Sequence, residues 1–217
     1  PSIEQLFAGN SGTAINDGAA NEMGRSSYVG RLNYSYRNRY LLKTILRADA
    51  SAKFPPEKRW GYFPAVSLGW RISEEGFMQK ANAVDDLKFR ISYGSSGNDG
   101  VGNFQYLSGY AIDMNYLINN VVRQGIVSTG MENSNLTWEK IKIYNAGFDF
   151  SLLKRKLYGT AEVFYRTRTG IPATRITTLP STFGASLPPE NLNSINNRGF
   201  ELELGTVGNI GKLLYDI

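Results

Sequence analysis

The chain has 217 residues, of which 41% are hydrophobic and 20% charged, as in many globular proteins. It contains no cysteine and no histidine, which excludes disulfides, thiolate metal sites and histidine-based catalysis, and we expect no cofactor. The net charge of +5 comes from scattered lysines and arginines rather than a basic run, which argues against nucleic acid as a partner.

Alternation of apolar and polar residues predicts β-strands along the chain, because successive side chains of a strand point to opposite faces. The first strand, over 27–37, places Tyr28 and Leu32 opposite Arg31 and Asn33. Further strands are expected over 40–51, 59–73, 87–95, 138–151, 157–168 and 196–206, and a last one begins near Leu213. No window approaches the ~18 to 20 apolar residues that a transmembrane helix needs.

The connections between these strands alternate in length. Tight turns are predicted at Asn38–Arg39, 154–156 and 208–211, and long loops over 96–137 and 169–195. The segment 74–86 is an exception that leaves room for one short helix. Short turns at one end and long loops at the other are typical of outer-membrane β-barrels.

The stretch RWGYFPAVSLGWRIS, residues 59–73, indicates the height of the predicted sheet. Ten residues span roughly 33 Å, and a tilt of about 40° leaves about 25 Å, the apolar band of an outer-membrane barrel. We expect Trp60 and Tyr62 at one membrane interface and Trp70 at the other, and we count Trp138 among the interface aromatics. The same residues could instead fill the core of a soluble β-sandwich.

Pro64 conflicts with both interpretations of this strand. Proline cannot donate a ladder hydrogen bond, and a closed barrel has no free edge on which to place it. We therefore predict a β-bulge at Phe63–Pro64.

Seven segments resemble, in order and spacing, consecutive landmarks of the SusC-like TonB-dependent transporters. They are GRLNYSYRNRYLL (30–42), RADASAKF (47–54), RWGYFPAVSLGWRISEE (59–75), DLKFRISYGSSGN (86–98), NLTWEK (135–140), YNAGFDF (144–150) and NRGFELEL (197–204). The resemblance covers nearly the whole chain from about Ile3 onward. The family's GYFP proline falls on Pro64.

The resemblance implies an all-β fold, an antiparallel up-and-down transmembrane barrel of 22 strands with an N-terminal plug, in the cell outer membrane. Residues 1–217 would be a partial barrel domain of about eight strands, without the plug and the remaining strands. The implied partners are TonB (through the missing N-terminal region), the plug domain of the same protein, a SusD-like surface lipoprotein and outer-membrane lipid. The implied function is the wall of a nutrient importer for oligosaccharides or peptides.

Charged residues on one side of the alternation are expected to face the barrel lumen. They are Arg31, Lys43, Arg47, Asp49, Arg71, Lys88, Arg90, Glu162, Arg166, Glu201 and Glu203. Their mixed signs fit a ladder of cross-strand ion pairs, or the docking of the plug or of a polar substrate. In the long loop, Tyr106, Tyr110 and Tyr116 are candidates for stacking on sugar rings, although they could equally pack the loop or contact the lipoprotein.

The sequence does not suggest an enzyme. Adjacent carboxylates such as Glu74–Glu75 point to opposite faces of a strand, and Glu201 and Glu203 have no evident substrate cleft. Two other classes stay open. A soluble or secreted β-sandwich carbohydrate-binding module would bury the Tyr and Leu faces against a second sheet, and a secreted adhesin would show repeated loops, which are not visible here.

Overall fold

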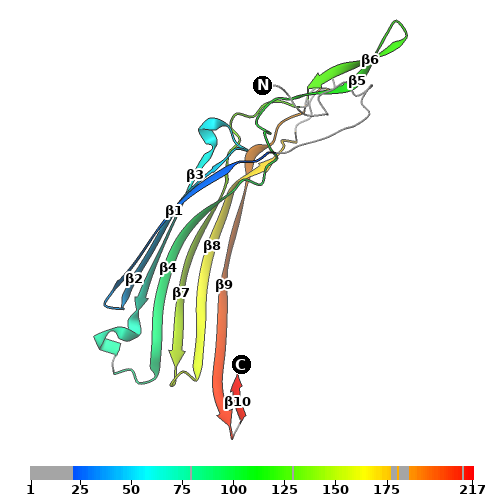
Figure 1. Ribbon diagram of the computed structural model, residues 1–217. Coiled ribbons are helices and arrows are strands. Elements are labelled where there is room, and N and C mark those ends of the chain that lie inside the picture. Colours follow the sequence, from blue (N-terminus) through cyan, green and yellow to red (C-terminus); the bar gives the residue numbers. More distant parts are fainter. Residues whose placement is uncertain (1–21, 79, 129, 177–179, 181–185, 212) are drawn as a thin grey trace.

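The computed structural model describes residues 22–78, 80–128, 130–176, 180, 186–211 and 213–217. One antiparallel sheet dominates it, in the order β1-β2-β3-β4-β7-β8-β9-β10 (Figure 1). Its strands are β1 (Arg25–Tyr36), β2 (Tyr40–Ser51), β3 (Trp60–Arg71), β4 (Val84–Asn98), β7 (Glu139–Leu152), β8 (Leu157–Ala173), β9 (Glu190–Ile210) and β10 (Leu213–Asp216). The predicted all-β, up-and-down fold is therefore confirmed.

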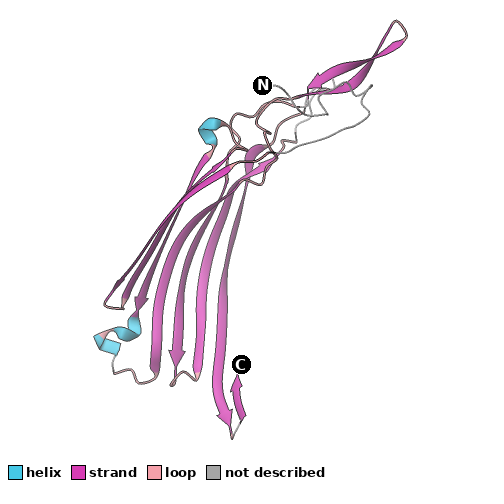
Figure 2. Cartoon of the chain, viewed as in Figure 1, coloured by secondary structure: helices cyan, strands magenta, loops and turns pink. Residues whose placement is uncertain are grey.

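The sheet is open, and within the described residues β1 and β10 are its two edges. The helical parts of the described chain are three short 3-10 turns, η2 (Pro56–Lys58), η3 (Ile72–Glu74) and η4 (Gly76–Met78), shown in cyan in Figure 2. The space left for one short helix at 74–86 thus holds part of η3 and all of η4. No helix in this part of the chain combines the length and hydropathy required to cross a membrane.

Each of the eight strands predicted for the large sheet is present, but several are longer than expected. β4 runs to Asn98, β8 to Ala173, and β9 over Glu190–Ile210, so that Gly211, with φ 63°, begins the last turn. The predicted loop over 169–195 shrinks accordingly, and its residues 177–179 and 181–185 lie outside the described part. Continued backbone pairing between β8 and β9 explains the extension, since the ladder reaches Ala173↔Glu190.

The prediction of one long loop over 96–137 is wrong for part of this segment. It contains a second, two-stranded sheet made of β5 (Tyr110–Ile118) and β6 (Val121–Ser128). Asn119 and Asn120 join the strands with φ 51° and 64°, the left-handed conformation of a tight hairpin turn. This hairpin projects beyond the end of the large sheet that carries the longer connections, away from the short turns (Figure 1).

Pro64 lies in a continuous ladder with β2, opposite Leu46, so the predicted bulge is wrong. The backbone of Arg71 donates to the carbonyl of Arg39 and that of Ser51 to the carbonyl of Arg59, so odd residues of β3 bond to β2. The backbone N–H and C=O groups of the even residues, among them Pro64, therefore point toward β4. There the ladder ends at the neighbouring pair, Ala65↔Gly94, and no partner on β4 requires the missing N–H.

Candidate functional site

One face of the large sheet is apolar and uncovered. Among the described residues, nineteen aromatic and aliphatic side chains of this face are at least 37% exposed: Tyr28, Leu32, Tyr34, Tyr36, Tyr40, Leu46, Trp60, Tyr62, Val66, Leu68, Trp70, Ile91, Tyr144, Phe148, Val163, Tyr165, Phe200, Leu202 and Leu204. The β-sandwich alternative requires a second sheet packed on these side chains, and the described chain has no such sheet. A continuous apolar surface of this extent marks contact with another apolar phase or partner.

The opposite face is polar. Residues directly opposite each other in a ladder share a face, so the register can be followed from strand to strand. The register pairs Arg31 with Ile45, Lys43 with Ser67, and Ser67 with Ser92. It continues in the same way across β7, β8 and β9. It places all the expected lumen-facing residues on this one face: Arg31, Lys43, Arg47, Asp49, Arg71, Lys88, Arg90, Glu162, Arg166, Glu201 and Glu203.

Ion pairs cross the middle of the polar face. The Arg90 guanidinium donates to Asp149, with Nε 3.1 Å from Oδ1, and also to Glu162. Lys88 Nζ lies 3.3 Å from Asp149 Oδ2, and Asn145 donates to Glu162. Three neighbouring strands, β4, β7 and β8, are thus linked by charge as well as by backbone, as the ladder interpretation predicts.

The other expected lumen residues fall into two groups. Arg47 pairs with Asp49 at 2.6 Å, and Arg71 lies 3.5 Å from both Glu74 and Asp86. In contrast, five charged residues are exposed and form no ion pair with the described residues: Arg31, Lys43, Arg166, Glu201 and Glu203. These five charges are available to a partner on the polar side.

Trp138 does not join the exposed aromatics, and its expected place at the interface is corrected. Its side chain is 6% exposed and packs with Phe54, Phe63 and Leu136, its ring centroid 5.2 Å from that of Phe54 and 5.4 Å from that of Phe63. Its Nε1 donates to the Arg59 carbonyl at 2.9 Å. We call these four residues the rim cluster, since they lie where the sheet meets the longer connections.

Two buried carboxylates lie beside the rim cluster. Asp99 accepts hydrogen bonds from Arg25 and, at 2.8 Å, from the Ser51 hydroxyl. Glu139 is paired with Arg168. The Asp99 bonds join the start of β1, the end of β2 and the segment after β4, so the rim is tied across strands remote in sequence.

Exposed aromatics lie at both ends of β3. Near the longer connections, Trp60 stacks on Tyr28 at a centroid distance of 5.9 Å, and Tyr62 is 65% exposed. At the short-turn end, Glu75 Oε1 accepts hydrogen bonds from the Tyr40 hydroxyl at 2.7 Å and the Trp70 indole at 3.1 Å. These bonds hold the pKa of the Glu75 carboxyl below its usual value.

The three loop tyrosines are not brought together into one site. Tyr106 packs against the rim cluster, whereas Tyr110 and Tyr116 lie on the β5–β6 hairpin and are 76% and 50% exposed. The sequence interpretation that Tyr106 packs the loop is therefore the one that matches the structure.

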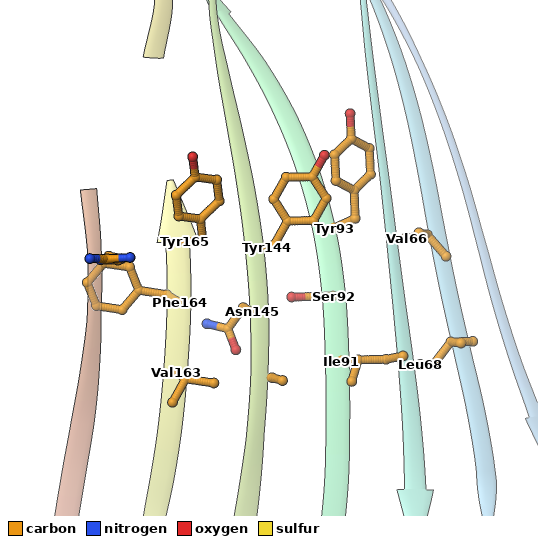
Figure 3. A pocket seen from close by; sticks show the side chains of 12 residues that line it. Val66, Leu68, Ile91, Ser92, Tyr93, Tyr144, Asn145, Val163, Phe164 and Tyr165 are labelled. Atoms are coloured by element: carbon orange, nitrogen blue, oxygen red, sulfur yellow. The ribbon is translucent and has the colours of Figure 1, made fainter. Parts of the chain in front are cut away.

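A groove of about 580 Å³ crosses the apolar face (Figure 3). Its upper edge is a row of three tyrosines, Tyr93, Tyr144 and Tyr165, with neighbouring ring centroids 5.0 and 6.4 Å apart. Leu68, Ile91, Ala146 and Val163 are among the side chains below it. The tyrosine hydroxyls point away from Ile91 and Val163, toward the longer connections. Sequence alternation placed these residues on one face but gave no sign of a depression.

A meandering sheet with one exposed apolar face and one charged face is the wall of a membrane β-barrel. The family model for "TonB dependent receptor-like, beta-barrel" matches residues 5–215, and the chain belongs to this family. TonB-dependent receptors are outer-membrane β-barrel proteins, so this chain is part of an outer-membrane barrel.

Curated relatives match most of the chain. TonB-dependent receptor SusC of Bacteroides thetaiotaomicron is 35% identical over 174 residues, which are 78% of this chain and 17% of the relative. TonB-dependent receptor P39 of Formosa agariphila is 34% identical over 169 residues, 78% of this chain and 16% of the relative. The chain therefore spans only about a sixth of the length of these relatives.

Solved structures share the fold. The RagAB peptide importer in its closed-closed state superposes with a TM-score of 0.77 at 24% identity, over 97% of this chain and 23% of that chain. The siderophore receptor PirA of Acinetobacter baumannii gives 0.54 at 13% identity, over 84% of this chain and 25% of that chain. The expected likeness to SusC-like transporters is confirmed.

Proposed function

We propose that residues 1–217 form a wall segment of a TonB-dependent importer that takes up oligosaccharides or peptides across the outer membrane. The single observation that carries the proposal is the division of the sheet into an apolar and a charged face. The apolar face contacts membrane lipid and the charged face lines the lumen. One similar structure is named as a peptide importer, which supports the choice of peptides, and the resemblance to SusC-like transporters supports the choice of oligosaccharides.

In this proposal the segment is passive, and the moving parts belong to the rest of the full-length protein. Arg31, Glu201 and Glu203, whose charges are not paired within the described chain, contact the plug domain or a polar substrate. The carboxylates Asp149 and Glu162 are held by arginine and lysine and keep the wall polar rather than acting as acid and base. We assign no catalytic role to the segment.

The longer connections form the outer rim in this proposal. A SusD-like lipoprotein lies over this rim, and TonB acts through a region N-terminal to the segment. Tyr110 and Tyr116 are the exposed aromatic candidates for contact with the lipoprotein or with a sugar ring.

Uptake by cells that lack the full-length protein tests the function. The deletion strain is expected to lose growth on one class of oligosaccharide or peptide, and the gene restored in full is expected to recover it. Uptake should also stop when a protonophore collapses the proton gradient, because TonB draws on that gradient. If the deletion strain imports every tested oligosaccharide and peptide at the parental rate, the importer assignment is wrong.

A further inference from the structure

Three cations lie on the apolar face, one level with the tyrosine row and two beyond it toward the longer connections. The ladder pairs Tyr93↔Tyr144, Tyr144↔Tyr165 and Tyr165↔Arg198 place Arg198 on the same face as the three tyrosines. Lys142 and Lys140 precede Tyr144 by two and four residues on β7 and share its face. We call Lys140, Lys142 and Arg198 the basic patch.

Within the described residues, no cation of the basic patch has an acidic ladder neighbour. All three side chains are exposed, and none forms an ion pair with the described residues. The ladder neighbours of Lys142 on the same face are Ser95 on β4 and Thr167 on β8, and Asn196 follows on β9. These are neutral hydrogen-bonding residues. An unpaired cation on a surface otherwise made for lipid is costly unless an anion meets it.

The groove adjoins this patch, because Arg198 is one of the residues that line it. The tyrosine hydroxyls point away from Ile91 and Val163 (Figure 3), in the direction in which Lys142 precedes Tyr144 on β7. Lys142 and Arg198 are separated by two strand spacings, about 10 Å, and by two residues along the strand, about 7 Å. Extended lysine and arginine side chains can close such a gap on one phosphate-bearing group. The basic patch thus suits the charged headgroup of an amphiphile, and the apolar groove suits its acyl chain.

We propose that the groove and the basic patch together bind a membrane lipid with a phosphorylated headgroup. The phosphate is bound by Lys142 and Arg198, the tyrosine hydroxyls donate to the headgroup, and an acyl chain lies over Ala146 between Ile91 and Val163. The lipid belongs to the leaflet next to the longer connections. This inference rests on the proposed function in one respect, namely that the apolar face contacts lipid.

Native mass spectrometry of the full-length protein in detergent tests the site, with dioleoylphosphatidic acid as the probe and dioleoylglycerol as its uncharged counterpart. The parent protein is expected to retain phosphatidic acid and to bind dioleoylglycerol far less. Lys142→Gln with Arg198→Gln is expected to lower phosphatidic acid occupancy by about tenfold or more, since two charge-assisted contacts are lost. Arg198→Lys should retain most of the binding.

The matched control is Lys43→Gln with Arg166→Gln, which removes the same charge from two exposed residues of the polar face. It should bind phosphatidic acid like the parent. Equal occupancy in the patch variant and the parent would overturn the lipid site, as would equal loss in both double variants. Quenching of Leu68→Trp fluorescence by brominated lipid separates this outcome from failure of the proposed function. If Leu68→Trp is quenched but the patch variant binds phosphatidic acid like the parent, the lipid site alone is refuted. If Leu68→Trp is not quenched, the membrane wall is refuted.

Discussion

In the full-length protein, Leu68→Arg is expected to lower the free energy of barrel unfolding by about 2 kcal/mol, because a cation on the lipid face costs about 2–4 kcal/mol at the midplane and less toward the interfaces. Leu68 lies on the apolar face with 46% of its surface exposed, two residues before Trp70 on β3. Lipid offers the guanidinium no hydrogen-bond partner at this level. Equilibrium urea unfolding in phospholipid vesicles measures the change.

Ser67→Arg is the matched control, one residue earlier on the same strand. Ser67 lies on the polar face, opposite Lys43 and Ser92. Its substitution should cost well under 1 kcal/mol apart from a small repulsion by Lys43, because the added charge stays in water. Equal losses at the two positions would show that β3 does not separate lipid from an aqueous lumen.

Phe63→Ala is expected to destabilise the same protein by about 3–5 kcal/mol, the usual cost of removing a buried aromatic ring. Phe63 is 2% exposed, and its ring packs against Trp138 in the rim cluster. A cavity there would loosen the segment that holds Leu136 and Trp138, so protease added to intact cells should also cut between β6 and β7 faster. Urea unfolding and the cleavage rate are the two measurements.

Tyr62→Ala provides the comparison, because Tyr62 is the adjacent residue but is 65% exposed on the apolar face. Its loss should be clearly smaller than that of Phe63→Ala, and the cleavage rate should not change. If Tyr62→Ala proved the more damaging variant, the rim cluster would not be what secures this end of the sheet.

Strand alternation was sufficient to predict the large sheet, because its two faces meet different surroundings. In β3, for example, Val66 and Leu68 are exposed on one side while Ser67 lies on the other, and a period of two follows directly. The same alternation assigned every expected lumen residue to a common face. Neighbouring strands of the large sheet follow one another in sequence, apart from the β5–β6 hairpin inserted between β4 and β7, so little long-range information was needed to order them.

The rim could not be predicted in this way. Trp138 was assigned by residue type to the exposed aromatics, but its indole meets Phe54, Phe63 and the Arg59 carbonyl, which are about eighty residues away in sequence. Asp99 likewise finds Arg25 across 74 residues. One signal was available: Phe63 is an aromatic residue on the polar side of its strand, which requires an apolar partner on that side.

The hairpin and Pro64 show two other limits. The Asn119–Asn120 pair is a turn signal, but the segment around it is rich in glycine, asparagine and serine, a composition that also predicts a loop. At Pro64 the missing donor suggested a bulge, whereas the ladder to β4 ends beside it. Where a ladder ends is a property of two strands together and is not visible in one of them.

Tryptophan placed at position 68 or 67 of the full-length protein tests the central claim most directly. In vesicles that contain phospholipids with brominated acyl chains, fluorescence of Leu68→Trp should be strongly quenched, whereas that of Ser67→Trp should respond to an aqueous quencher and not to bromine. The difference between each variant and the parent isolates the added residue from the three native tryptophans of this chain. Equal access of the aqueous quencher to both positions, or bromine quenching at neither, would contradict a wall with one face in lipid and the other in the lumen.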